Sequence, residues 1–154
     1  MDLILWRHAD AEDGVDDLAR PLTPKGIKQA KKVATWLREQ LKDAAEYRVI
    51  ASEAVRSQAT AQQLRADFEI NAKINPGCHN ACYLEVARWP RDIGKFVVVV
   101  GHQPNLGEVA ALLLTGKELE WNTRKGGIWW IQRKVMDDGR VKYVLKAALS
   151  PDLL

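Results

Sequence analysis

The sequence predicts an α/β fold, a three-layer α/β/α sandwich with a mostly parallel central sheet. Two short apolar runs, residues 3–6 and 96–100, lack the alternation of a half-exposed strand and are typical of buried parallel strands. Segments with helical spacing of apolar residues alternate with the strands, which favours a layered α/β architecture. At 154 residues, the chain is expected to form one domain over residues 1–154.

The first predicted helix follows a loop at residues 9–22 that is rich in Asp, Glu and Gly. It begins at Thr23-Pro24, because Thr is a good N-cap and Pro fits the first helical position. Its apolar side is predicted to consist of Ile27, Ala30, Val33, Ala34, Leu37 and Leu41. A second strand is expected at 48–51, followed by a helix that Ser52 caps and that reaches about Phe68.

The second half of the chain repeats the pattern and then changes character. Residues 69–79 are expected to be irregular, with a short helix near 80–88, and the strand at 96–100 leads into a helix that starts at Pro104 and ends at Gly116. Residues 127–133 and 141–145 flank an Asp-Gly pair and are typical of a β-hairpin.

Composition is that of an ordinary globular protein, with 47% hydrophobic and 28% charged residues and a net charge of +3. The densest basic group, Lys25, Lys28, Lys31 and Lys32, is interpreted as the solvated face of a helix, with a docking surface as the alternative. With this interpretation of the charge, no nucleic-acid partner is expected. No membrane partner is expected either, since no apolar run approaches the roughly 18 residues of a membrane span. We expect a cytoplasmic protein in which Cys78 and Cys82 are free thiols.

Charged and imidazole groups follow the strands where a ligand would bind. Arg7-His8 ends the first strand and Gly101-His102 ends the strand at 96–100. Ligands of open parallel sheets bind outside the carboxyl ends of the strands. Arg56 lies in the first turn of the helix after the second strand, beside backbone amides that favour anions. The pattern predicts one anion site at this edge of the sheet.

These elements resemble those of the histidine phosphatase superfamily, which has the phosphoglycerate mutase-like fold. The corresponding segments are Arg7-His8-Ala9 for Arg-His-Gly, Leu22 to Gly26 for Leu-Thr-x-x-Gly, Ser52 to Ala61 for Ser-x-x-x-Arg-(Ala/Ser)-x-x-Thr-Ala, and Val100-Gly101-His102 for the second histidine element. The short length is most similar to the SixA branch of phosphohistidine phosphatases. The resemblance implies that His8 is the nucleophile and that Arg7, Arg56 and His102 bind the phosphoryl oxygens, without a metal or other cofactor.

The general acid of the family has no clear counterpart, because residues 71–81 contain no Asp or Glu. Glu85, Glu53, His79 or no group at all remain open for this role. An alkyl phosphate expels an alkoxide that needs a proton, whereas phosphohistidine expels imidazole, whose conjugate acid has a pKa of about 6.5. The sequence therefore favours a phosphohistidine-bearing protein, such as a phosphorelay or phosphotransfer domain, as the substrate.

Several alternatives stay open at this point. The function could be that of a small-molecule phosphomonoesterase for sugar or nucleotide phosphates, or of a non-catalytic phosphate- or phosphoprotein-binding module. The acidic loop after His8 is either solvated or fixed by a pair between Asp17 and Arg20. Cys78, His79 and Cys82 form an incomplete set of metal ligands.

Overall fold

The protein is described by a computed structural model that covers residues 1–91 and 95–154. Its strands are β1 (Asp2–Arg7), β2 (Tyr47–Ala51), β3 (Glu69–Ile70), β4 (Phe96–Gly101), β5 (Ile128–Val135) and β6 (Val141–Leu149). They form a six-stranded sheet in the order β3-β2-β4-β1-β5-β6. The first four strands pair in parallel, whereas β5 and β6 are antiparallel additions at one edge.

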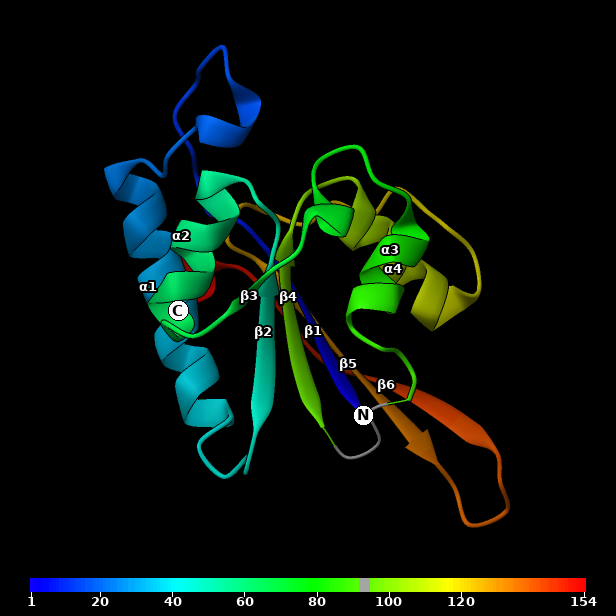
Figure 1. Cartoon of the computed structure of the whole chain (residues 1–154). Helices are drawn as coiled ribbons and strands as arrows, with labels where there is room; N and C mark the ends of the chain where they lie inside the picture. Colours follow the sequence, from blue (N-terminus) through cyan, green and yellow to red (C-terminus); the bar gives the residue numbers. More distant parts are fainter. Residues whose placement is uncertain (92–94) are drawn as a thin grey trace.

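Four helices cover the two faces of this sheet. They are α1 (Pro24–Gln40), α2 (Val55–Leu64), α3 (Asn80–Val86) and α4 (Asn105–Thr115), with short 3-10 turns at Asp17–Ala19, Ala72–Ile74 and Pro151–Leu153. Figure 1 shows α1 and α2 on one face and α3 and α4 on the other. The predicted three-layer α/β/α sandwich is confirmed.

The central position of β1 and β4 in the sheet explains why apolar and polar residues do not alternate in their sequences. Ile4 and Trp6 of β1 pack into the core beneath α1 and α2, whereas Leu3 and Leu5 pack into the core on the opposite face. All four side chains are fully buried. A strand that is covered on both faces is apolar throughout, which is the pattern that the sequence shows.

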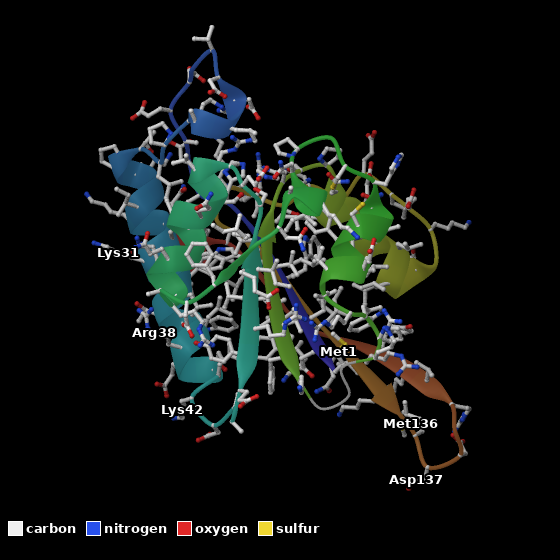
Figure 2. The ribbon with its side chains drawn as sticks, viewed as in Figure 1. Met1, Lys31, Arg38, Lys42, Met136 and Asp137 are labelled. Carbon is white, nitrogen blue, oxygen red and sulfur yellow. The ribbon has the colours of Figure 1, made fainter. Side chains whose placement is uncertain are left out.

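The start of α1 was predicted correctly except for one residue of its apolar side. Thr23 is the N-cap, and its hydroxyl accepts a hydrogen bond from the Gly26 amide at 2.9 Å. Ile27, however, is 38% exposed. The first turn of α1 faces the preceding loop through Gly26, where an added Cβ would lie 2.0 Å from the carbonyl oxygen of Asp10. Charged side chains such as Lys31 extend from the outer side of the helix (Figure 2).

The prediction for α2 was wrong at both ends. The helix begins at Val55 with Ala54 as N-cap, because the Ser52 hydroxyl contacts His102 instead of capping the first turn. It ends at Leu64, since Arg65 is extended and its guanidinium bonds to the Tyr47 carbonyl oxygen. The segment expected to be irregular also contains the short strand β3 and a 3-10 turn.

The predicted elements of the second half are all present, but β5 continues to Val135 and β6 to Leu149, beyond the predicted ends at 133 and 145. Gly116 ends α4 with a positive φ of 78°, and β5 and β6 form the predicted hairpin around Gly139, whose φ is 82°. The carboxyl ends of β1, β2 and β4 meet at one edge of the sheet, below the loop that contains the first 3-10 turn (Figure 1). This edge receives the side chains that the sequence singled out.

Candidate active site

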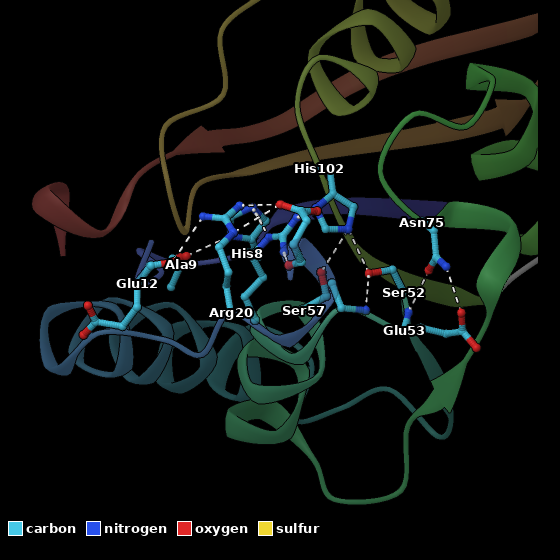
Figure 3. Close-up of polar contacts among 12 residues, drawn as sticks. His8, Ala9, Glu12, Arg20, Ser52, Glu53, Ser57, Asn75 and His102 are labelled. Atoms are coloured by element: carbon cyan, nitrogen blue, oxygen red, sulfur yellow. Dashed lines mark hydrogen bonds and ion pairs between the residues drawn. The ribbon is translucent and has the colours of Figure 1, made fainter. Parts of the chain in front are cut away.

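A cavity of about 260 Å³ lies at the carboxyl ends of β1 and β4. It is lined by Arg7, His8, Ala11, Asp17, Arg20, Arg56, Pro76, His102, Gln103 and Lys125. All four residues predicted to form the site therefore line one cavity. Figure 3 shows two of them, His8 and His102. The lining holds four cationic side chains and one carboxylate, so the cavity suits an anion.

His8 is fixed at the end of β1 by its backbone and by its ring. Its amide donates to the Gly101 carbonyl oxygen at 3.1 Å, and its own carbonyl accepts from the Gly126 amide at 3.1 Å. In the ring, Nδ1 lies 2.8 Å from the carbonyl oxygen of Ala9, which can only accept, so Nδ1 carries the proton. The guanidinium of Arg56 approaches Nε2 at 3.3 Å as a donor, which agrees with a lone pair at Nε2. The hydrogen bond to a backbone carbonyl oxygen thus fixes the tautomer of His8.

His102 lies beside His8, with ring centroids 5.2 Å apart, but its ring is held differently. Its Nε2 lies 2.8 Å from the Ser52 hydroxyl and 3.3 Å from the Ser57 hydroxyl. Its Nδ1 faces the Arg56 guanidinium at 3.5 Å, which can only donate. The neutral ring therefore carries its proton on Nε2, the opposite arrangement to that of His8.

Gly101 is required before His102 because Tyr83 fills the space that a side chain would occupy. A Cβ at Gly101 would lie 2.2 Å from the Tyr83 hydroxyl oxygen. That hydroxyl accepts a hydrogen bond from the His102 amide at 2.9 Å. Tyr83 is fully buried in α3, so the helix on the second face of the sheet helps to position the histidine at its edge.

Arg56 connects the two histidines to the acidic loop. The residue is 3% exposed, and its guanidinium donates to the Asp17 carbonyl oxygen at 2.6 Å and to the Asp17 carboxylate at 3.1 Å. Asp17 also pairs with Arg20 at 3.0 Å, so the predicted Asp17–Arg20 pair is present. Burial raises the pKa of Asp17, but hydrogen bonds from the two guanidinium groups outweigh it and hold this pKa below its ordinary value.

Arg7 has a free donor. One terminal nitrogen of its guanidinium donates to the Thr123 carbonyl oxygen at 2.7 Å, whereas its buried Nε has no hydrogen-bond partner among the described residues. A buried donor without a partner costs free energy, about 1–3 kcal/mol, unless a ligand satisfies it. Arg7 is thus suited to bind an anion in the cavity.

Sequence reasoning missed the contributions of Arg20, Lys125 and Gln103 to this cavity. Arg20 was considered only as the partner of Asp17, and Lys125 lies in a segment that has no motif. Lys125 pairs with Asp10 at 2.6 Å, which attaches the segment before β5 to the loop after β1. A contact between segments so far apart in the chain leaves no local signal in a single sequence.

Both histidines are held neutral. Burial lowers the pKa of His8 to about 4, and the charges of Arg56 and Arg7 act in the same direction, against the hydrogen bond to Ala9. Burial also lowers the pKa of His102 to about 3, with His8 and Arg56 as further causes. Burial is therefore the largest cause of the lowered pKa of both rings.

The candidates for a general acid all lie outside the cavity. Glu53 is exposed and accepts a hydrogen bond from Asn75 at 2.8 Å, turned away from the histidines (Figure 3). Glu85 pairs with Lys73 on the surface of α3, and His79 is exposed and borders a different hollow. Among the described residues, Asp17 is the only carboxylate that lines the cavity, and its pairs with two arginines keep it ionised.

The possible metal site at Cys78, His79 and Cys82 does not form. In residues 1–91 and 95–154, no group of three or more His, Cys, Asp and Glu side chains is arranged to hold a metal ion. Both cysteines are free thiols, as predicted. The helices of these same ranges are all too short or too polar to cross a membrane.

An anion site at the strand ends of a three-layer α/β sandwich is typical of phosphate-binding proteins. Comparison of the sequence with known families identifies the family. The profile of the histidine phosphatase superfamily (branch 1) matches residues 3–92. An uncharacterised protein from Picosynechococcus sp. is 34% identical over 145 residues, which span 83% of this chain and 82% of that protein. The chain belongs to the histidine phosphatase superfamily, as its motifs predicted.

Solved structures share the fold over nearly the whole chain. The protein histidine phosphatase SixA in complex with tungstate has a TM-score of 0.75 and 24% identity, covering 99% of both chains. A SixA-type protein from Nakamurella multipartitia also has a TM-score of 0.75 and 24% identity, covering 97% of this chain and 95% of its own. A phosphoserine phosphatase variant from Entamoeba histolytica, in complex with phosphoserine, has a TM-score of 0.67 and 19% identity, covering 99% and 98%. These likenesses show the phosphoglycerate mutase-like fold.

Proposed function

We propose that this protein is a metal-independent phosphatase that works through a phosphohistidine at His8 and removes phosphate from phosphohistidine on a protein. The observation that carries the proposal is the cavity itself. In the cavity, the lone pair of His8 Nε2 lies among arginine side chains. Among the described residues that line it, the one carboxyl group is Asp17, which is ionised and has no proton to donate. Family membership supports phosphatase chemistry, and the cavity supports the choice of substrate.

In the first step, His8 Nε2 attacks the phosphorus of the substrate. The P–N bond to the substrate ring breaks, and its electron pair stays on that ring. Attack requires a neutral His8, and a pKa of about 4 keeps the ring neutral near pH 7. The Nδ1 proton that is hydrogen-bonded to Ala9 stabilises the positive charge that the ring acquires.

Arg7, Arg56 and His102 stabilise the phosphoryl group during transfer. Phosphoryl transfer depends mainly on positioning and on charge stabilisation, which guanidinium groups supply well. Arg56 exchanges its contact with Nε2 for a phosphoryl oxygen, and Arg7 offers the unpartnered Nε. The dianion next to His102 raises the pKa of that ring, so that a protonated Nδ1 donates to an oxygen.

In the second step, water attacks the same phosphorus. The P–Nε2 bond breaks, its electron pair returns to His8, and dihydrogen phosphate leaves. The ring is thereby restored to the neutral form with its proton on Nδ1. Neither step needs a carboxylic acid when the leaving group is an imidazole ring. The other nitrogen of that ring is protonated from the solvent near neutral pH before the P–N bond breaks, so that a neutral imidazole leaves.

The test compares two substrates. A histidine-containing phosphotransfer domain, phosphorylated on its histidine, and glycerol phosphate are supplied to the wild type and to His8→Ala. His79→Ala is the matched control, since His79 is an exposed histidine outside the cavity. We expect kcat/KM at least about 100-fold higher for the phosphodomain, an estimate based on the usual contribution of proton transfer. His8→Ala abolishes this turnover and His79→Ala retains it.

The opposite preference would make the protein a small-molecule phosphomonoesterase and would require an acid that the cavity does not show. Phosphate binding without turnover of either substrate would identify a binding module. Glu53→Gln and Glu85→Gln complete the test. Retention of full activity in both variants supports a reaction without a general acid, and a loss in one of them assigns that role.

A further inference from the structure

A second and larger hollow adjoins the cavity of the candidate active site. Its volume is about 610 Å³, compared with about 260 Å³ for the cavity, and the two share Arg7 and Lys125 in their linings. We call it the basic groove, after its six cationic side chains, Arg7, Lys25, Lys28, Lys32, Arg124 and Lys125. It runs from the cavity along α1 to the C-terminal 3-10 turn, which packs against α1.

The positive charge of the protein is concentrated in this groove. One acidic residue, Asp152, lines it beside the six cations, so the lining carries a net charge of +5. That excess is larger than the net charge of +3 of the whole chain. The rest of the protein is therefore net acidic. The excess of basic over acidic residues in the whole chain is therefore accounted for by the lining of this groove.

The groove also divides the lysine cluster of α1. Lys25, Lys28 and Lys32 line it, three and four residues apart, on one side of the helix. Lys31 does not line it and extends from the outer side of α1 (Figure 2). All four lysines are solvent-exposed, as expected of a solvated face, and three of them also line the groove.

Little in the protein neutralises the lysines nearest the cavity. Lys125 pairs with Asp10, Arg124 lies 4.0 Å from Asp152, and Lys32 donates to the Leu154 carbonyl oxygen at 3.3 Å. Lys25 and Lys28 have no ion pair with any residue in 1–91 or 95–154. The ammonium groups of Lys25 and Lys28 therefore line the groove without an ion pair, although the charge of Lys25 helps to lower the pKa of Asp10.

We infer that the basic groove binds an acidic segment of the phosphoprotein substrate and so determines which phosphohistidine reaches His8; this inference rests on the proposed function. The cations along α1 span seven residues, or about 10 Å at the helical rise of 1.5 Å per residue. A second phosphate on a small molecule would occupy two or three of these groups. A segment with several Asp or Glu residues matches the whole row, and charge complementarity of this kind supplies specificity and faster association.

Two phosphohistidine peptides test the inference. One carries about four Asp or Glu residues on one side of the phosphohistidine, and the other has Asn or Gln at those positions. Binding is measured by fluorescence anisotropy on the His8→Ala protein, because this variant leaves the phosphoryl group on the peptide. Hydrolysis is measured separately with His8 intact. The charge-reversal variants are Lys28→Glu in the groove and Lys31→Glu one turn away, which change the net charge equally.

We expect the acidic peptide to bind about tenfold more tightly than the neutral one at low salt, and the two to bind within about twofold at 0.5 M salt, where charges are screened. Lys28→Glu removes most of the preference, and Lys31→Glu keeps it. Equal binding of both peptides to the wild-type groove overturns the inference, even if both are hydrolysed. An equal loss of preference in Lys28→Glu and Lys31→Glu overturns it as well.

Hydrolysis distinguishes this inference from the proposed function. Preferential binding of the acidic peptide without hydrolysis of either peptide supports the groove and contradicts the phosphatase assignment. A sugar bisphosphate that displaces the acidic peptide and is hydrolysed faster than both peptides overturns the inference in favour of a small substrate with two phosphates.

Discussion

His8 and His102 occupy equivalent places at the ends of adjacent parallel strands, but the protein holds them in opposite ways. His8 donates a hydrogen bond from Nδ1 to a backbone carbonyl oxygen and keeps a lone pair at Nε2. His102 directs its Nε2 to two serine hydroxyls and presents Nδ1 to Arg56. In the proposed function, the same residue at the same kind of position thus acts as a nucleophile in one case and as a phosphate ligand in the other, according to its neighbours.

Replacement of each histidine by glutamine gives the sharpest test of this difference. We expect His8→Gln to lose at least about 1,000-fold in kcat and to form no phosphoenzyme, because the nucleophile is gone. His102→Gln should lose about 100-fold, as is usual for one stabilising donor, and should still carry phosphate on His8. Rapid quenching at alkaline pH with radiolabelled substrate measures the phosphoenzyme. Label on the His8→Gln protein would reverse the two roles.

The burial of both rings predicts a loss of stability in mild acid. The folded-state pKa values, about 4 for His8 and about 3 for His102, lie below the unfolded value of about 6.5. Between these values the unfolded chain binds protons that the folded protein does not, so the free energy of unfolding falls as the pH falls through this window. Each histidine should account for about 2 kcal/mol between pH 7 and pH 5.

Urea unfolding at the two pH values measures this effect. The double variant with His8→Asn and His102→Asn should lose most of the dependence on pH, whereas His79→Ala, the exposed control, should unfold like the wild type. An unchanged dependence in the double variant would place the acid-sensitive groups elsewhere.

The serines around His102 give the smallest expected effect. Ser52→Ala should lower kcat about fivefold and leave KM nearly unchanged, because the ring of His102 loses its shorter hydrogen bond, a loss of about 1 kcal/mol. Ser57→Ala should lower kcat less, since its contact is 3.3 Å against 2.8 Å. Steady-state kinetics with rescue by Ser52→Thr separates positioning from a general structural defect. Equal effects of the two alanine variants would contradict the greater strength expected of the shorter contact to Ser52.

Much of the fold could be predicted because it depends on local patterns. The unalternated apolar runs of β1 and β4 indicated strands buried on both faces, and Thr23-Pro24 and Gly116 marked helix ends. The end of α2 was missed because Arg65 bonds to the Tyr47 carbonyl oxygen, a contact that overrides the helix propensity of the following residues. The start of α2 was missed because Ser52 bonds to His102 rather than to its own helix.

By itself, the sequence determined the order of strands and helices, the family, and the presence of His8, Arg7, Arg56 and His102 at one edge of the sheet. These features follow from short motifs and from the rule that parallel strands share their carboxyl ends. The tertiary structure alone decided which ring nitrogen of each histidine carries the proton, that Asp17 is the counter-ion of Arg56, and that Lys28 lines the basic groove whereas Lys31 does not. These properties depend on groups brought together from distant segments, and contacts of that kind leave no periodicity or spacing for a single sequence to reveal.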